Sequence, residues 1–455
     1  MKNSNTLDMT AGSPLSLIIR FSLPLLAGNV LQQLYNMVDS MVVGNFVGSN
    51  AFAAVNISFP IVFLMSSLFL GIGGGASVLI SQFYGAGDME KVQKTVDTIY
   101  KVTLLGAIPM TIIGLLAVRP LFRLIEVPES QMEMAVTYCL IIFAGLIGSL
   151  GYNVNAGILQ GLGNGKAPLI FLAISSAINV VLDLLLVAVV PWGVAGAAIA
   201  TIAAQFGSWA FGIIYINKHI DGIQIRFKTE HDKELLGQII KLGVPTAIQT
   251  SQFSVAMLIM QWVVNGFGDN FVAGFTAANK VDAFAFLPIQ SLSIAMTTYV
   301  GQNIGAGLVE RVKRGVRSGV LLSVGLCVVI TAAVLPLMDQ ILLLFINDTP
   351  EITAAVLESG KGYLVRVMPP MVFLAVSFVI SGALRGSGEA IAPMVASIFS
   401  MWLIRVPVAL IIPRFSSVSE DMFWCYGIGW FVGICITIPV YLRGSWQKNI
   451  LKARS

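Results

Sequence analysis

Charged residues are scarce in this sequence. Asp, Glu, Lys and Arg make up 11% of the 455 residues, whereas 56% are hydrophobic. A soluble globular protein has about 25% charged residues, and a water-soluble fold of this length would have too few charges to cover its surface. The mean hydropathy of +0.85 agrees with this reading. The composition therefore excludes a water-soluble fold and predicts an integral membrane protein.

Residues that build metal, redox or phosphate sites are also few. The four cysteines lie far apart in apolar stretches, which favours buried side chains over a disulfide framework or a metal site. The two histidines, His219 and His231, share one polar segment and have no HExxH partner. The sequence contains no Gly-x4-Gly-Lys-Ser/Thr loop for nucleotide phosphates. We therefore expect no bound cofactor, no ATP hydrolysis and no enzymatic activity.

Long apolar segments make up most of the chain. A helix needs about 20 mainly apolar residues to cross about 30 Å of hydrocarbon. The segments that meet this criterion are residues 15–45, 52–82, 95–118, 133–160, 167–190, 193–217, 240–266, 272–302, 316–343, 355–384, 391–412 and 422–443. The first begins at Leu15 and is too long for a cleavable signal peptide. We predict an all-α polytopic membrane protein with about twelve transmembrane helices.

Lysine and arginine are distributed unevenly between the two sides of this predicted bundle. The connections on the N-terminal side hold most of them, such as Lys91, Lys94 and Arg314, whereas the opposite side holds few, such as Arg119. Cytoplasmic loops of membrane proteins carry an excess of basic residues. We therefore place both termini in the cytoplasm, in a multi-pass protein of a prokaryotic-type inner or plasma membrane. Because topology accounts for the 27 basic residues, they predict no nucleic-acid partner.

The sequence contains an internal repeat. Gln82 and residues 85–87, after the second predicted span, reappear with the same spacing as Gln302 and residues 305–307, after the eighth. Six spans per half place both halves in the membrane the same way up, so a pseudo-two-fold axis along the membrane normal relates them. Transporters of this design bind substrate between the halves and work by alternating access, although a repeat also serves packing alone. The predicted lobes are residues 1–225 (N-lobe, spans 1–6) and 226–455 (C-lobe, spans 7–12).

Two carboxylates fall inside predicted spans of the first half. A charged side chain at mid-membrane costs about 2.5–3.5 kcal/mol on insertion scales, so such residues are functional candidates by default. Asp39 lies 19 residues beyond Arg20, which is about 28 Å along an outward-running helix. Asp183 lies 15 residues beyond Pro168, also on an outward-running helix. Both acids are therefore expected in the outer half of the bilayer, in the same lobe.

Oxygen and amide groups are expected at a similar depth beside these acids. Asn36 shares a helix face with Asp39, Asn179 precedes Asp183 by four residues, and Tyr138 and Thr201 fall in the neighbouring spans. Such a cluster suits a hard cation or a proton, and two neighbouring acids do not both ionise cheaply. The alternative is ordinary hydrogen bonding between helices, worth about 0.6 kcal/mol per bond. That alternative is credible for the amide and hydroxyl groups but weak for two carboxylates with no basic partner in the same half.

The second half differs from the first. Its positions equivalent to Asp39 and Asp183 are about Met260 and Val408, which are apolar. Its polar groups within spans, a weaker set of candidates for lining a substrate cavity, are Gln249, Gln252, Lys280 and Asp282, with Arg405 in the eleventh span. Because Lys280 and Asp282 are two residues apart, they do not share a helix face. A structural ion pair across helices and a functional role stay equally open for both.

In these features the whole chain resembles the multidrug and toxic compound extrusion (MATE) transporters of the MOP flippase superfamily. The resemblance rests on the two six-span lobes, Pro24 with Asp39, the repeated Gln82 motif, and Asn179 with Asp183. Within the family the chain looks DinF-like, and the residues that match the amino-lobe ion site are Asp39, Tyr138, Asn179, Asp183, Thr201 and, less securely, Asn153. If the ion is sodium, the resemblance makes Asp39, Asp183 and Asn179 its ligands. The acids of the NorM-like branch are replaced here near Phe253 and Leu374, so we expect no carboxy-lobe cation site.

The resemblance implies antiport. H+ or Na+ moves inward down its gradient while a small organic compound, often cationic or amphipathic, leaves across the lipid bilayer. Because the transport path lies within one chain, a functional monomer is expected, and the oligomeric state is otherwise left open. The main alternative is a lipid or polysaccharide-precursor flippase of the same superfamily, which usually has more spans or an arginine-rich cavity for phosphates. An intramembrane enzyme would need a nucleophile–base or metal constellation, and a channel fits asymmetric lobes less well. The exported compounds, the choice between proton and sodium, and the roles of Lys280, Asp282 and Arg405 are left open by the sequence.

Overall fold

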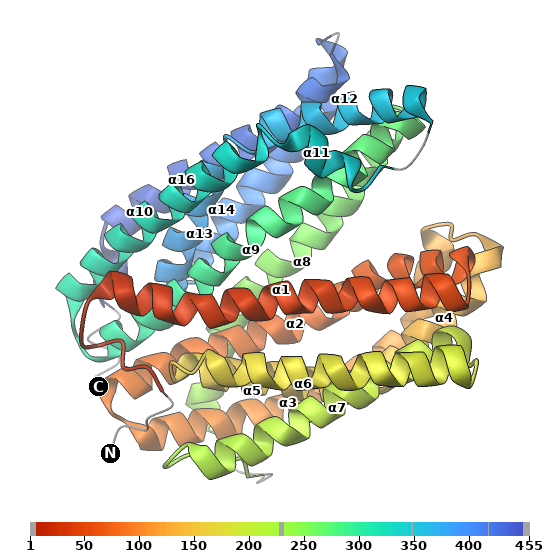
Figure 1. Ribbon diagram of the computed structural model, residues 1–455. Helices are drawn as coiled ribbons and strands as arrows, with labels where there is room; N and C mark the ends of the chain where they lie inside the picture. The colour runs from red at the N-terminus through yellow and green to blue at the C-terminus, as the bar shows by residue number, and fades with distance from the viewer. Residues whose placement is uncertain (1–5, 227–231, 347–348, 417, 449–455) are drawn as a thin grey trace. The chain divides into compact units, whose positions relative to one another are not determined.

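The structure is a computed structural model that describes residues 6–226, 232–346, 349–416 and 418–448. Within these ranges the chain is helical and contains no strand (Figure 1). The polar segment near the middle of the sequence is described in part, since residues 227–231, which include His231, lie outside these ranges. The predicted all-α polytopic fold is therefore confirmed.

The helices follow one another with short connections. The first half contains α1 (Pro14–Phe46), α2 (Ser49–Ala86), α3 (Met89–Leu124), α4 (Glu129–Ala144), α5 (Leu146–Gly161), α6 (Lys166–Asp183), the π-helix η1 (Leu184–Val189) and α7 (Gly193–His219). The second half contains α8 (Lys233–Asn265), α9 (Asp269–Gly305), α10 (Val309–Val334), α11 (Met338–Leu343), α12 (Pro350–Val367), α13 (Met371–Gly386), α14 (Ile391–Ile398), the π-helix η2 (Phe399–Arg405), α15 (Val406–Ile411), η3 (Ile412–Arg414), η4 (Ser419–Phe423), α16 (Trp424–Leu442) and η5 (Ser445–Lys448).

Ten of the described helical segments are long and apolar enough to cross a membrane, and the number is twelve if each of two bent helix pairs counts as one span. The pairs are α4 with α5, bent by 54°, and α12 with α13, bent by 49°. The sequence predicts unbroken spans at both places. The first break is at Gly145 and the second at Pro369 and Pro370, where glycine lowers helix propensity and proline lacks the N–H that continues a helix. The two breaks occupy corresponding positions of the repeat.

The described residues form two compact units. The first contains Met1–Asp8 and Leu23–Ser251, and the second contains Met9–Ser22 and Gln252–Ser455. Helices α1 and α8, which open the two predicted lobes, are thus each divided between the units. The division of α1 falls beside Pro24, whose ring removes one backbone hydrogen bond from the helix interior.

The segment before α1 is built into the second unit by polar contacts. The side-chain oxygen of Gln302 accepts a hydrogen bond from the backbone N–H of Met9 at 2.9 Å. The guanidinium of Arg311 donates to the carbonyl oxygens of Met9 and Gly12 at 3.1 and 2.9 Å. The Met9 side chain is fully buried. The second copy of the repeated glutamine motif therefore binds the start of the chain.

Glycines on α2 allow the first part of α8 to pack closely in the first unit. A Cβ atom at Gly71 would lie 2.4 Å from the backbone nitrogen of Ala247, and one at Gly75 would lie 2.7 Å from the carbonyl oxygen of Ile239. One turn before Gly71, the hydroxyl groups of Ser67 and Ser251 are 2.5 Å apart. Small residues let helix backbones approach in a membrane, where apolar burial from water does not drive helices together.

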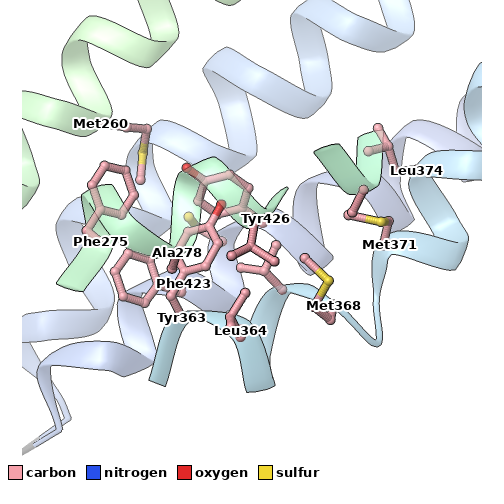
Figure 2. Close-up of a cluster of buried hydrophobic side chains, with 14 of the residues drawn as sticks. Met260, Phe275, Ala278, Tyr363, Leu364, Met368, Met371, Leu374, Phe423 and Tyr426 are labelled. Atoms are coloured by element: carbon pink, nitrogen blue, oxygen red, sulfur yellow. The ribbon is translucent and has the colours of Figure 1, made fainter. Parts of the chain in front are cut away.

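The second unit has an aromatic core near the N-terminal end of α9. The rings of Phe275, Tyr363 and Phe423 pack on one another with centroids 4.8–5.7 Å apart, and Tyr426 stands edge-on to Tyr363 (Figure 2). The cluster joins α9, α12, η4 and α16. Met260, at the position that the repeat aligns with Asp39, is buried at the border of this apolar cluster. The second unit therefore has hydrocarbon where the first has an acid.

Candidate functional site: a buried acidic pair in the first unit

Asp39 and Asp183 come together in the first unit. Asp39 lies on α1 and is 7% exposed, whereas Asp183 is the last residue of α6 and is fully buried. The two carboxyl groups are close enough to influence each other electrostatically. None of the ion pairs among the described residues involves either acid. A pair of buried acids without a cation is costly unless a proton or another cation neutralises it.

The backbone changes its winding at Asp183. Helix α6 passes there into the π-helix η1, whose wider turn is uncommon and is found often at functional sites. The carboxylate therefore sits at the point where the regular α-helical hydrogen-bond pattern ends.

Four oxygen atoms of the site have no hydrogen-bond donor among the described residues. They are Oδ1 of Asp39, both carboxylate oxygens of Asp183, and Oδ1 of Asn179. Asn179 is fully buried one turn before Asp183 on α6. A buried polar atom is normally hydrogen-bonded, and an unpartnered one requires an explanation. Oxygen atoms that all lack donors are suited to receive a proton or a hard cation.

Thr201 on α7 positions two of the surrounding side chains. Its hydroxyl oxygen accepts hydrogen bonds from the amide of Asn179 and from the hydroxyl of Tyr35, each at 3.4 Å. The amide nitrogen of Asn179 is thereby directed to Thr201, which leaves the amide oxygen free to face a ligand. Tyr35 interacts electrostatically with both Asp39 and Asp183.

Tyr35 is the residue of this site that the sequence analysis missed. It precedes Asp39 by four residues and therefore lies on the same face of α1. This four-residue spacing from Asp39 is the sequence feature that could have identified Tyr35 as a site residue. The spacing is weak evidence by itself, because tyrosine is common in apolar helices without a polar role.

Tyr138 borders the acidic pair and joins it to an apolar layer. Its hydroxyl is close enough to Asp39, Tyr35 and Asp183 to interact with them electrostatically. It packs against a buried cluster formed by residues of α1, α2, η1 and α7, namely Val42, Val43, Ala51, Val55, Val187, Val194 and Ala197. Val43 and Val187 each follow one of the acids by four residues, so this layer separates the pair from the helix ends at Phe46 and Val189. Hydrocarbon on that side limits access of water to the acids.

Two predicted site residues have their contacts elsewhere. The side-chain oxygen of Asn36 accepts from the amide of Gln32 at 3.3 Å, one turn away on α1. The amide of Asn153 donates to the carbonyl oxygen of Ser149 at 2.8 Å within α5. The structure therefore gathers Asp39, Asp183, Asn179, Thr201 and Tyr138, and gives Asn36 and Asn153 partners on their own helices.

The polar candidates of the second half do not share one cluster of contacts. Gln252 donates to the hydroxyl of Ser397. The ammonium of Lys280 is exposed and lies 5.2 Å from the ring centroid of Phe345. Gln249 belongs to the part of α8 in the first unit, where it is buried.

Asp282 and Arg405 have aromatic neighbours in the second unit. The hydroxyl of Tyr363 donates to Oδ2 of Asp282 at 3.2 Å. The guanidinium of Arg405 lies 3.4 Å from the ring centroid of Tyr426, and its charge acts on Asp282. No ion pair among the described residues joins Arg405 to Asp282, and Oδ1 of Asp282 has no hydrogen-bond partner there. Asp282 thus differs from the acids of the first unit in its tyrosine donor and in the nearby positive charge, although one of its oxygens is likewise unpartnered.

A metal centre of the kind formed by three or more His, Cys, Asp or Glu side chains is not found among the described residues. The acidic pair with its amide and hydroxyl neighbours instead has the donor set of a proton or monovalent-cation site. The chain has apolar spans in two repeat-related halves, and an acidic pair is buried in one of these halves. These features define a multi-pass membrane transporter.

Comparison with known proteins agrees. Residues 24–185 and 245–411 match the MatE family, and the chain belongs to that family of membrane transporters. It is 30% identical over 437 residues to the probable multidrug resistance protein YoeA of Bacillus subtilis (strain 168), covering 94% of this chain and 93% of YoeA. It is 31% identical to the probable multidrug resistance protein YpnP of the same organism, covering 97% of each chain.

Solved structures give the same assignment. A multidrug resistance MATE family transporter of the MOP superfamily, solved in an outward-facing conformation, superposes with a TM-score of 0.90 at 25% identity, covering 98% of this chain and 100% of that chain. The expected family and fold are therefore confirmed. The two matched segments, one in each half, also agree with the internal repeat.

Proposed function

We propose that the protein is a cation-coupled multidrug efflux antiporter that exports small organic, cationic or amphipathic compounds by alternating access. H+ or Na+ moves inward through the first unit as the compound leaves. The observation that carries this proposal is the buried Asp39–Asp183 pair. Four oxygen atoms of the pair and Asn179 have no donor in the part of the chain that the structure describes. The names of YoeA and YpnP as probable multidrug resistance proteins support export of drugs.

The energetics of the pair explain how an ion would drive transport. A carboxylate at mid-membrane costs about 2.5–3.5 kcal/mol, and within the described ranges no ion pair offsets that cost for the fully buried Asp183. Binding of H+ or Na+ removes it, and release of the ion restores it. A ligand shifts a conformational equilibrium only by its difference in affinity for the two states. Ion binding at this pair provides that difference.

Helix α1 would transmit the change. Asp39 lies on the part of α1 in the first unit, and Pro24 lies where that part begins. Proline kinks are common points of bending in helices. Neutralisation of Asp39 is therefore expected to shift the first-unit part of α1 about Pro24 and to release bound drug.

The orientation of the chain follows from its basic residues. We place both termini in the cytoplasm of a prokaryotic-type inner or plasma membrane, because Lys and Arg are concentrated on the N-terminal side. Since the ion site lies within one chain, the functional state is proposed to be a monomer.

The test is efflux of an organic cation from everted vesicles with a pH gradient or a sodium gradient imposed separately. Wild-type protein is compared with Asp39→Asn, which keeps the side-chain shape but removes the charge. Asp269→Asn, at an exposed acid at the start of α9, makes the same chemical change outside the site. All three proteins are brought to equal amounts in the membrane.

We expect one gradient to drive efflux by wild type and Asp269→Asn, and neither to drive efflux by Asp39→Asn. Efflux by Asp39→Asn at the wild-type rate would refute the role of the pair. If wild-type efflux does not depend on either gradient, antiport is refuted. A lipid-flipping assay would then test the flippase alternative.

A further inference from the structure

The second unit contains an open pocket at the end where α10 begins and α16 ends. Its volume is about 450 Å³, and it lies between α10, α13, α16 and η5. Most of its lining is aliphatic, from residues such as Val320, Leu321, Val376, Ile380 and Ile438. Leu321 is 64% exposed, which places its side chain at the lipid-facing surface of α10. The pocket is therefore continuous with the hydrocarbon that surrounds the helices.

Two cations line the same pocket. Lys313 and Arg317 are one turn apart on α10, and both are exposed. The ammonium of Lys313 is 2.8 Å from the carboxylate of Glu310, which is itself mostly exposed. No ion pair joins Arg317 to a described residue. The pocket thus carries net positive charge beside its apolar lining.

Aromatic residues line the end of the pocket that α16 and η5 form. The ring of Trp446 is 2% exposed and stacks on Tyr441 with centroids 5.5 Å apart. Its indole N–H donates to the backbone carbonyl oxygen of Tyr441 at 2.9 Å. Trp and Tyr collect at the level of the lipid headgroups. This rigid pair, just beyond the end of α16, places Lys313 and Arg317 close to that level.

The repeat does not reproduce this charge in the first half. At the offset of 220 that relates Gln82 to Gln302, Lys313 corresponds to Gln93 and Arg317 to Asp97. There the amide of Gln93 donates to Asp97 at 2.9 Å. A lysine and an arginine thus stand where the other half has an amide and an acid, so the positive pocket is specific to the second unit.

We propose that this pocket binds an anionic phospholipid. Its phosphate lies against Lys313 and Arg317, and an acyl chain runs along the aliphatic lining of α10, α13 and α16. Charge complementarity selects this occupant, because the two cations repel the organic cations proposed as exported compounds and attract a phosphodiester. The apolar lining requires an alkyl chain, which free phosphate lacks. In the proposed orientation the lipid comes from the inner leaflet.

The test is native mass spectrometry of the full chain, purified in detergent and titrated with phosphatidylglycerol or phosphatidylcholine. The double variant Lys313→Gln/Arg317→Gln is compared with Lys91→Gln/Lys94→Gln. The control pair lies on α3, at the corresponding end of the other half, and both of its lysines are paired with neighbouring acids, as Lys313 is. A third variant, Val320→Trp, fills the pocket and leaves its charges in place. Melting temperatures confirm that all variants are folded.

We expect the wild type and the α3 control to bind phosphatidylglycerol more tightly than phosphatidylcholine. A basic residue near anionic lipid is worth about five-fold in affinity, so loss of both is expected to weaken phosphatidylglycerol binding about thirty-fold. Val320→Trp is expected to weaken it as well. Equal binding by the double variant and the wild type, equal affinity for the two lipids, or displacement by glycerol phosphate, which has no acyl chain, would each overturn the proposal.

Discussion

Gly71→Ala adds only one methyl group, but we expect it to lower the free energy of unfolding clearly. The new Cβ atom would lie 2.4 Å from the backbone nitrogen of Ala247 and 2.5 Å from its Cα atom. Ordinary contacts of a Cβ atom begin at 3.4 Å, so α2 and α8 must separate by about 1 Å, the difference between 3.4 and 2.4 Å. Both contacts are backbone atoms, which no rotamer change removes. Overpacking of this kind costs about 1–3 kcal/mol.

Gly73→Ala is the matched control. A Cβ atom at Gly73, on the same helix two residues later, would meet nothing within 4 Å. Alanine is favoured over glycine in a helix by about 0.8–1.0 kcal/mol, so this variant is expected to be as stable as the wild type or slightly more stable. Both variants gain the same helix propensity, so they should differ in free energy of unfolding by the overpacking cost alone, about 1–3 kcal/mol.

The assay is unfolding of the purified protein in mixed micelles by titration with a denaturing detergent, followed by tryptophan fluorescence. The expected order of stability is Gly73→Ala, wild type, Gly71→Ala. A companion change on the facing helix, Gly243→Ala, should resemble Gly71→Ala, because its Cβ atom would lie 2.6 Å from the Cα atom of Ile72. If Gly71→Ala and Gly73→Ala are equally stable, the close approach of α2 and α8 is refuted.

Two further predictions concern hydrogen bonds. Thr201→Val removes the hydroxyl that accepts hydrogen bonds from Tyr35 and Asn179, so it should slow gradient-driven efflux several-fold at a stability cost of about 1 kcal/mol. The control is Thr437→Val, which should leave efflux unchanged because the Thr437 hydroxyl bonds within its own helix. Equal efflux by both variants would contradict the role of Thr201. Tyr363→Phe removes the hydrogen bond to Asp282 inside the aromatic core of Figure 2 and should lower the free energy of unfolding by about 1.5–3 kcal/mol. Tyr152→Phe, at a hydroxyl with no described hydrogen bond, should cost much less in the same micelle titration.

Much of the fold followed from local sequence patterns. The spans were predictable because a run of about 20 apolar residues is long enough to cross the hydrocarbon of a bilayer as a helix. The observed helix bounds differ from the predicted ones mainly at the ends. The fourth and tenth spans, which are bent pairs, and the ninth span are exceptions. Residues 316–343 were predicted as one helix, but α10 ends at Val334 and α11 begins at Met338, with Pro336 in between. Apolar composition does not reveal such an interruption.

The candidate site was predictable in part. Asp39, Asp183, Asn179 and Thr201 stood out because polar groups within apolar spans are costly, and the structure brings their side chains together. Tyr35 was missed because its hydroxyl acquires a polar role only through Thr201, which is 166 residues away in the chain. Sequence spacing along one helix does not disclose a partner on another.

The sequence by itself determined the membrane environment, the number of spans, the repeat and which acids lie within spans, because hydrophobicity and helix periodicity are properties of short segments. The tertiary structure decided which polar groups meet. It left Asp39 and Asp183 together with no ion-pair partner among the described residues, whereas it gave Asp282 a tyrosine hydroxyl and the nearby charge of Arg405. It also divided α1 and α8 between the two units. These outcomes depend on the packing of helices that are distant in the chain, where the desolvation of each polar group is balanced by whichever side chains the other helices bring to it.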